Sequence, residues 1–192
     1  MSGHKFHGPR GTGIMFRKKN APFMPIIRGG SHENKMRAGT ENTPGIVGIT
    51  KALEIATEEI SKEMPRIAKL RDKLQLKIIE NIPDVLINGG NAPRVPNTLN
   101  ISVKYIEGEG MLFLLDAEGI MVSSGSACTS GSLEPSHVLL AMGLDHATSH
   151  GSIRFSLGKD NTDADIVTVI DIFPKVIHKL RMMSPFTPKE LK

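Results

Sequence analysis

Apolar residues recur every three or four positions along one long stretch of the chain, from Ile46 to Ile82. This spacing places them on one face of a helix, the pattern of an amphipathic helix packed against a core. Pro65 falls inside the stretch, but the apolar positions keep their phase on both sides of it. We therefore predict one kinked helix or two abutting helices, with Thr43 as N-cap and Pro44 in the first turn.

Shorter segments of the second half alternate apolar and polar residues. The alternation is regular at residues 98–103 and 152–157, and two more short apolar runs lie at residues 85–87 and 120–122. A period of two is typical of a strand with one buried face, so we predict strands at these four places. The pattern also puts Arg154 on the face opposite its apolar neighbours.

Three more helices are predicted between and after these strands. They cover residues 108–118, residues 138–142 and a segment that opens at Thr162. Glycine follows the first two, and Asp165 forms a capping box with Thr162 in the third. Because helices and strands interleave without strict alternation, we predict an α+β fold in which helices pack on a small sheet.

The composition narrows the class of protein. A chain of 192 residues with 39% hydrophobic residues and no Trp forms one domain, or one and a part, around an aliphatic core. The formal net charge is +4, but basic residues are interspersed with acidic ones, so we do not expect nucleic-acid binding. The absence of a long apolar run and of a signal peptide predicts a soluble, cytoplasmic protein with no membrane partner.

The single cysteine, Cys128, lies in a run of Ser, Gly, Ala and Thr at residues 123–132. One cysteine excludes an intrachain disulfide and a four-cysteine metal site. Its small neighbours predict a mobile loop with an exposed thiol. Cys128 is then either a reactive thiol that moves between a reaction centre and a partner, or a free surface cysteine. His146 and His150 have the spacing of a metal pair but no third ligand nearby, so no metal site is predicted.

Three further residues are candidates for chemistry, and each has an alternative interpretation. Lys5 lies between His4 and glycine-rich sequence and could form a Schiff base in a pocket, or it is a solvated residue near a chain end. Arg154 could present its planar fork to a carboxylate, or pair with a surface acid. Thr40 could bind a phosphate oxygen, or cap a helix. The glycine-rich loops around these residues can cradle an anion, but no nucleotide P-loop pattern is present.

Six motifs together resemble the cysteine desulfurases of the NifS and IscS type, which are fold-type-I enzymes that depend on pyridoxal phosphate. The resemblance covers almost the whole chain. The motifs are Ser-Gly-His-Lys at 2–5, Gly-Pro-Arg-Gly-Thr-Gly at 8–13, Arg-Ala-Gly-Thr-Glu-Asn at 37–42, Ser-Ser-Gly-Ser-Ala-Cys-Thr-Ser-Gly at 123–131, Leu-Glu-Pro-Ser-His-Val-Leu at 133–139 and Ser-Ile-Arg-Phe-Ser-Leu-Gly at 152–158.

The resemblance implies a role for each cofactor residue. Lys5 would form the Schiff base with pyridoxal phosphate and later act as base on the substrate Cα. Ser2 and His4 would contact the cofactor phosphate. Thr40 would reach the phosphate bound by the neighbouring subunit of a homodimer.

The resemblance also implies the substrate and the fate of its sulfur. Arg154 would hold the α-carboxylate of L-cysteine. Cys128 would attack the substrate sulfur, leaving L-alanine and a persulfide on Cys128. The persulfide would pass to a scaffold protein for iron–sulfur clusters or to another sulfur acceptor.

The chain departs from the family in its length. In the family the Schiff-base lysine lies near the middle of the protein, so roughly the first half has no counterpart here. That half supplies the histidine, aspartate and glutamine that contact the cofactor ring. We therefore expect residues 1–44 to be a C-terminal strip of the large cofactor-binding domain, residues 45–192 to be the small C-terminal domain, and the chain to be inactive alone.

Two other functions agree with the same residues. In one, the chain is a non-catalytic sulfur-carrier or interaction domain whose Cys128 accepts a persulfide from elsewhere; such a carrier would not need the cofactor on Lys5. In the other, the enzyme acts on selenocysteine as a lyase. Both a truncated reading frame and a split enzyme with a separate N-terminal chain agree with the length.

Overall fold

A computed structural model of the chain describes residues 1–124 and 135–192. They form two compact units, Met1–Lys62 (unit 1) and Glu63–Lys192 (unit 2). The predicted division into residues 1–44 and 45–192 stays a prediction, because it refers to the domains of a longer protein. The fold is mixed α+β, as predicted. Its elements in the described residues are α1 (Thr43–Asn81), β1 (Val85–Ile87), β2 (Thr98–Val103), α2 (Gly108–Ala117), α3 (His137–Ala141), α4 (His146–His150), β3 (Ser152–Ser156) and α5 (Asp163–Met183), with 3-10 turns η1 (Gly3–Phe6), η2 (His32–Lys35) and η4 (Lys189–Leu191).

Helix α1 contains Pro65 and continues on both sides of it, so the stretch is one helix and not two abutting ones. Its N-cap is Asn42 and not Thr43. The side-chain oxygen of Asn42 accepts a hydrogen bond from the Gly45 N–H at 3.2 Å, and its carbonyl accepts one from the Ile46 N–H at 2.9 Å. An Asn side chain satisfies the free N–H groups of a first helical turn in this way.

Unit 1 has little regular structure besides the start of α1 and two short 3-10 turns. Its apolar side chains are largely exposed: Ile26 is 97% exposed and Phe16 is 87% exposed. The prediction of one buried apolar stripe along α1 is therefore wrong for the half that lies in unit 1. There Ile49 is buried, but Ile46 and Ile60 are exposed, because no other layer of unit 1 covers them in the described residues.

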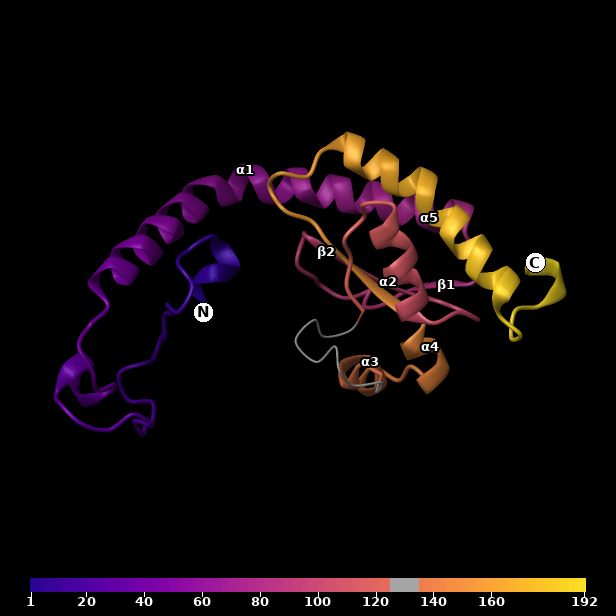
Figure 1. Cartoon of the computed structure of the whole chain (residues 1–192). Helices are drawn as coiled ribbons and strands as arrows, with labels where there is room; N and C mark the ends of the chain where they lie inside the picture. Colours follow the sequence, from indigo (N-terminus) through magenta and orange to yellow (C-terminus); the bar gives the residue numbers. More distant parts are fainter. Residues whose placement is uncertain (125–134) are drawn as a thin grey trace. The chain divides into compact units, whose positions relative to one another are not determined.

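Unit 2 is built on a three-stranded antiparallel sheet in the order β1-β2-β3. The alternating apolar residues of β2 and β3 face one core, which they share with the C-terminal part of α1, α2 and α5. In β1, by contrast, Leu86 is 42% exposed. Figure 1 shows α5 and this part of α1 above the sheet, and α3 and α4 below it. The ring of Phe173 in α5 is fully buried and meets Phe155 of β3 edge to face, with centroids 5.5 Å apart.

The opposite face of the sheet carries polar side chains. Asn100 lies opposite Arg154, and Ser102 lies opposite Ser152, across the β2–β3 pair. The side-chain amide of Asn88 donates to the side-chain oxygens of Asn100, at 2.6 Å, and of Ser102, at 2.9 Å. The period of two along each strand thus separates an apolar face from a hydrogen-bonded polar one, and Arg154 lies on the polar face as predicted.

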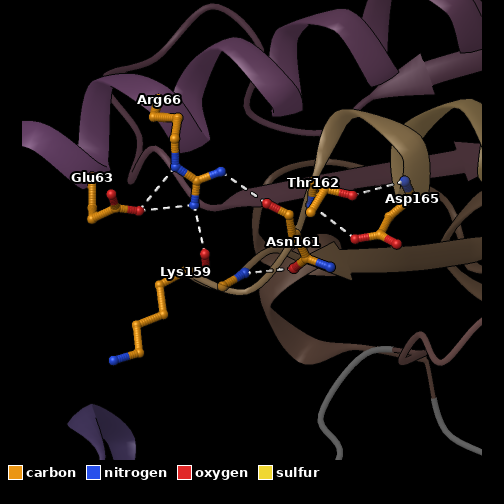
Figure 2. Close-up of polar contacts among 7 residues, drawn as sticks. Glu63, Arg66, Lys159, Asn161, Thr162 and Asp165 are labelled. Carbon is orange, nitrogen blue, oxygen red and sulfur yellow. Dashed lines mark hydrogen bonds and ion pairs between the residues drawn. The ribbon is translucent and has the colours of Figure 1, made fainter.

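An arginine holds the turn between β3 and α5 (Figure 2). The guanidinium of Arg66, on α1, donates to the carbonyl oxygens of Lys159, at 2.7 Å, and Asn161, at 2.8 Å. It also pairs with Glu63 one turn earlier in α1, at 2.8 Å. The carbonyls of a sharp turn lack strand partners, so this side chain supplies the donors that they need.

The predicted capping box at the start of α5 is present (Figure 2). The Thr162 N–H donates to the Asp165 carboxylate at 2.8 Å, and the Asp165 N–H donates to the Thr162 hydroxyl at 3.4 Å. Asn161 adds a further contact, because its side-chain oxygen accepts from the Gly158 N–H at 2.7 Å. The main chain from the end of β3 into α5 is therefore fixed by side chains at successive positions.

A buried arginine lies at the other end of unit 2. Arg181 is 3% exposed and donates to the carbonyl oxygen of Pro83 at 2.7 Å. Burial lowers the pKa of its guanidinium, an effect opposed by the charges of Asp84 and Tyr105. Tyr105 follows β2 and has a left-handed backbone, with φ of 73°.

Among the described helices, none is both long and apolar enough to cross a membrane.

Candidate functional site

Lys5 lies in the η1 turn of unit 1, which is fastened to the chain that follows it. The Gly3 N–H donates to the Thr12 carbonyl oxygen at 2.9 Å, and the Lys5 N–H donates to the Ser2 carbonyl oxygen at 3.1 Å. Ser2 also forms an isolated antiparallel bridge with Gly13. Hydrogen bonds thus hold the main chain of this turn, while both interpretations of the Lys5 side chain stay open.

The side chains of this turn are open to solvent. Ser2, His4 and Lys5 are all exposed, and no described carboxylate forms an ion pair with the Lys5 amine. An exposed amine with no described ion-pair partner, close in sequence to Ser2 and His4, fits an aldehyde cofactor that carries a phosphate. Thr40 is exposed too, and no hydrogen bond joins it to this turn in the described part of the chain.

Arg154 lies on β3 in unit 2, where a bridge to Ser123 fixes its main chain. The two residues exchange hydrogen bonds of 2.7 and 3.1 Å between their N–H and carbonyl groups. The Nη2 atom of Arg154 also donates to the Ser123 hydroxyl at 3.4 Å. The Nε atom is buried, and no described residue accepts a hydrogen bond from it. A buried guanidinium donor without an acceptor is a ready partner for a carboxylate.

The predicted strand at residues 120–122 is wrong. Only the next residue, Ser123, pairs with β3, and it does so as an isolated bridge. Ile120 is buried in the core and Met121 is 86% exposed, but the run itself forms no strand ladder. Cys128 follows in residues 125–134, which lie outside the described residues, and the predictions about its loop stay predictions.

The structure divides the predicted site residues between the two units: Ser2, His4, Lys5 and Thr40 belong to unit 1, and Arg154 to unit 2. His146 and His150 have ring centroids 5.7 Å apart in α4. No group of three or more possible metal ligands occurs among the residues that the structure describes.

Unit 2 contains a cavity of about 390 Å³ that no pattern in the sequence predicts. It opens beside residues 119–122, the end of β3 and the first turns of α5, and its polar lining includes Ser156, Asn161 and Thr168. The lining brings together Leu74, residues 119–122 and residues between 155 and 169, which are three separate segments of the sequence. None of the predicted site residues lines the cavity.

Comparisons with known proteins agree on one family. Residues 1–169 match the family model described as Aminotransferase class-V. The cysteine desulfurase IscS of Methanosarcina thermophila is 49% identical over 192 residues, which are 100% of this chain and 47% of that protein. A cysteine desulfurase of Nostoc sp. is 50% identical over 190 residues, which are 99% of this chain and 48% of that protein.

A solved structure supports the same family. A protein described as NifS-like is 38% identical and superimposes with a TM-score of 0.80, covering 93% of this chain and 45% of that one. The chain thus spans about half the length of the curated relatives it matches. The chain belongs to the class-V aminotransferase family, and within it to the cysteine desulfurases of the NifS and IscS type.

Proposed function

We infer that this chain supplies the sulfur-accepting and substrate-binding part of a pyridoxal phosphate-dependent cysteine desulfurase. The enzyme converts L-cysteine to L-alanine and transfers the sulfur to Cys128. The relatives that support this proposal are about half identical to the chain and about twice its length. We therefore expect the activity to require the residues that the other half of the relatives contains.

The observation that carries the proposal is the environment of Arg154. Its buried Nε lacks an acceptor among the described residues, while its backbone is held in the sheet and by Ser123. A guanidinium fork held in this way binds a carboxylate through two parallel hydrogen bonds. The amino acid L-cysteine carries such a carboxylate, and Arg154 would orient it so that its sulfur faces the incoming thiol.

The cofactor would be held by the η1 turn of unit 1. The amine of Lys5 would bind its aldehyde carbon, and Ser2 and His4 would contact its phosphate. Thr40 would contact the phosphate in the neighbouring subunit of a homodimer. When bound, pyridoxal phosphate supplies an electron sink for the bonds at the substrate Cα. The freed Lys5 amine would then accept the proton from that carbon.

The sulfur would leave the substrate by attack of a thiolate. The Cys128 sulfur forms a bond to the cysteine sulfur, and the bond from that sulfur to the substrate Cβ breaks. The electron pair of the broken bond stays with the carbon, which takes up a proton and becomes the methyl group of alanine. Cys128 keeps the sulfur as a persulfide and passes it to an acceptor, such as a scaffold for iron–sulfur clusters. Because a reactive single cysteine stays a free thiol in a reducing compartment, we propose a cytoplasmic location.

Borohydride reduction tests the cofactor site. The 192-residue chain is incubated with pyridoxal phosphate and reduced, and the modified lysine is mapped by mass spectrometry. The experiment is done with the chain alone and with the chain mixed with the N-terminal half of a homologous desulfurase, which we call the combined protein. We expect Lys5 to be modified in preference to Lys18, the next lysine in the sequence, when both halves are present. Equal modification of the two lysines in the combined protein would contradict the proposal.

Persulfide mapping tests the second half of the proposal. The combined protein is incubated with L-cysteine, and alkylated persulfide is located in the peptides. We expect it on Cys128, and we expect Cys128→Ser to abolish both the persulfide and alanine formation. Undiminished alanine formation by Cys128→Ser would show that another group removes the sulfur.

A further inference from the structure

The loop that follows the Lys5 turn lies against the first turns of α1, where the helix has glycines. A Cβ atom added at Gly48 would lie 2.6 Å from Cγ and 3.1 Å from Cδ of Pro9. One added at Gly45 would lie 2.5 Å from Cγ2 of Thr12. All of these residues belong to unit 1. Contacts this short would force the helix and the loop apart. The glycines at positions 45 and 48 therefore allow the loop to pack closely on α1.

Helix formation does not explain the glycine at position 48. Gly48 lies inside α1 without a left-handed backbone, and alanine would stabilise a helix better at such a position. Gly45, one turn earlier on the same face of the helix, is buried, so this face is covered. The small residue is therefore explained by the close approach of Pro9.

Two hydrogen bonds connect Pro9, through Thr12, to the turn that carries Lys5. The Pro9 carbonyl accepts a hydrogen bond from the Thr12 hydroxyl at 2.6 Å, and the Thr12 carbonyl accepts one from the Gly3 N–H at 2.9 Å. A Cβ on Gly3 would meet the Thr12 hydroxyl oxygen at 2.6 Å and Cδ1 of Ile49 at 3.0 Å. Since Gly3 begins the η1 turn, a shift of Pro9 moves the turn on which Lys5 lies.

We propose that Gly48 is a positioning residue for Lys5, because its missing side chain lets the Pro9 ring seat on α1 and so fixes the place of the η1 turn. The inference rests on the proposed role of Lys5 as the cofactor-binding amine. The contact itself does not depend on that role, so the two can be tested apart. A displacement of about 1 Å at a reacting group can lower a rate about 100-fold.

The test is Gly48→Ala in the full 192-residue chain, read by amide hydrogen exchange without cofactor. We expect faster exchange at Gly3 and Gly8, whose N–H groups hold the η1 turn, with no loss of thermal stability in α1. In the combined protein we expect the rate of borohydride-trapped modification at Lys5 to fall by roughly 10- to 100-fold. Unchanged exchange at these two amides would overturn the proposal.

A double variant shows whether the effect comes from the contact with Pro9. Pro9→Ala removes Cγ and Cδ, so Pro9→Ala/Gly48→Ala should recover slow exchange and the modification of Lys5. If Gly48→Ala does not fold, the double variant decides alone, and failure to recover the fold overturns the proposal. Gly158→Ala is the matched control, because a Cβ there would meet nothing within 4 Å. If exchange follows this pattern but Lys5 is not modified in the combined wild type, the proposed function fails and the contact stands.

Discussion

The main chains of Ser123 and Arg154 are joined by two hydrogen bonds, of 2.7 and 3.1 Å, in an isolated antiparallel bridge. This bridge joins Ser123, the first residue of the 123–131 motif, to β3. Strand β3 carries Arg154, the residue proposed to bind the carboxylate. The position of Arg154 therefore depends on main-chain hydrogen bonds, which substitution of its own side chain leaves in place.

Arg154→Gln should weaken binding of L-cysteine without unfolding unit 2. Loss of a charged hydrogen-bonding partner costs about 1.5–3 kcal/mol, which corresponds to a roughly 10- to 100-fold higher KM. Arg154→Lys keeps the charge and loses the fork, so we expect an intermediate KM. The KM is measured in the chain combined with the N-terminal half of a homologous desulfurase. An unchanged KM in Arg154→Gln would remove this residue from the substrate site.

Arg66→Met should destabilise unit 2. The methionine keeps the apolar stem of the side chain but loses the donors to the carbonyl oxygens of Lys159 and Asn161. We expect the free energy of unfolding to fall by about 1–3 kcal/mol. Urea unfolding followed by circular dichroism measures it. Lys51→Met is the control, because Lys51 makes only an exposed pair with Glu54 and should have no measurable effect.

Asp165 should make stability depend on pH in the acid range. The Thr162 N–H donates to its carboxylate and holds the pKa of that carboxyl below its ordinary value. A lowered folded-state pKa stabilises the fold above the unfolded-state pKa of about 3.9, and this stabilisation is lost as the pH falls through the folded-state pKa. Asp165→Asn should therefore be less stable than wild type at pH 7, and the difference should shrink below about pH 4. Unfolding curves at several pH values that show a constant difference would rule this out.

Phe173→Ala should be among the most destabilising single substitutions in unit 2. The ring is fully buried and packs edge to face with Phe155. A cavity of this kind costs about 3–5 kcal/mol, read as a lower midpoint of thermal unfolding. Phe113→Ala provides the comparison, because that ring is 75% exposed and its loss should change stability by less than about 0.5 kcal/mol. Equal effects of the two substitutions would mean that the core of unit 2 is not packed as described.

The secondary structure of unit 2 was predictable because its signals are local. The alternation at residues 98–103 and 152–157 identified β2 and β3, and Thr162 with Asp165 marked the start of α5. The run at residues 120–122 has the same apolar character but lacks a paired neighbour. A strand depends on that pairing, which the residues of one segment do not contain.

The candidate site was predictable only where its residues are neighbours in sequence or belong to a motif. The turn at Lys5 is short, so its exposed groups follow from the order of the residues. The contact of Gly48 with Pro9 and the bonds from Arg66 to Lys159 join residues far apart along the chain. Such contacts arise from the folded arrangement, and no periodicity or composition indicates them.

Tyr105, in the left-handed turn after β2, is an intrinsic fluorescent probe. Tyr105 is the only tyrosine and the chain has no tryptophan, so the intrinsic ultraviolet fluorescence comes from this one residue of unit 2. Unit 1 contributes no such signal. Melting curves recorded through tyrosine emission would therefore follow unit 2 alone, and circular dichroism at the same temperatures would show whether the residues around Lys5 unfold separately.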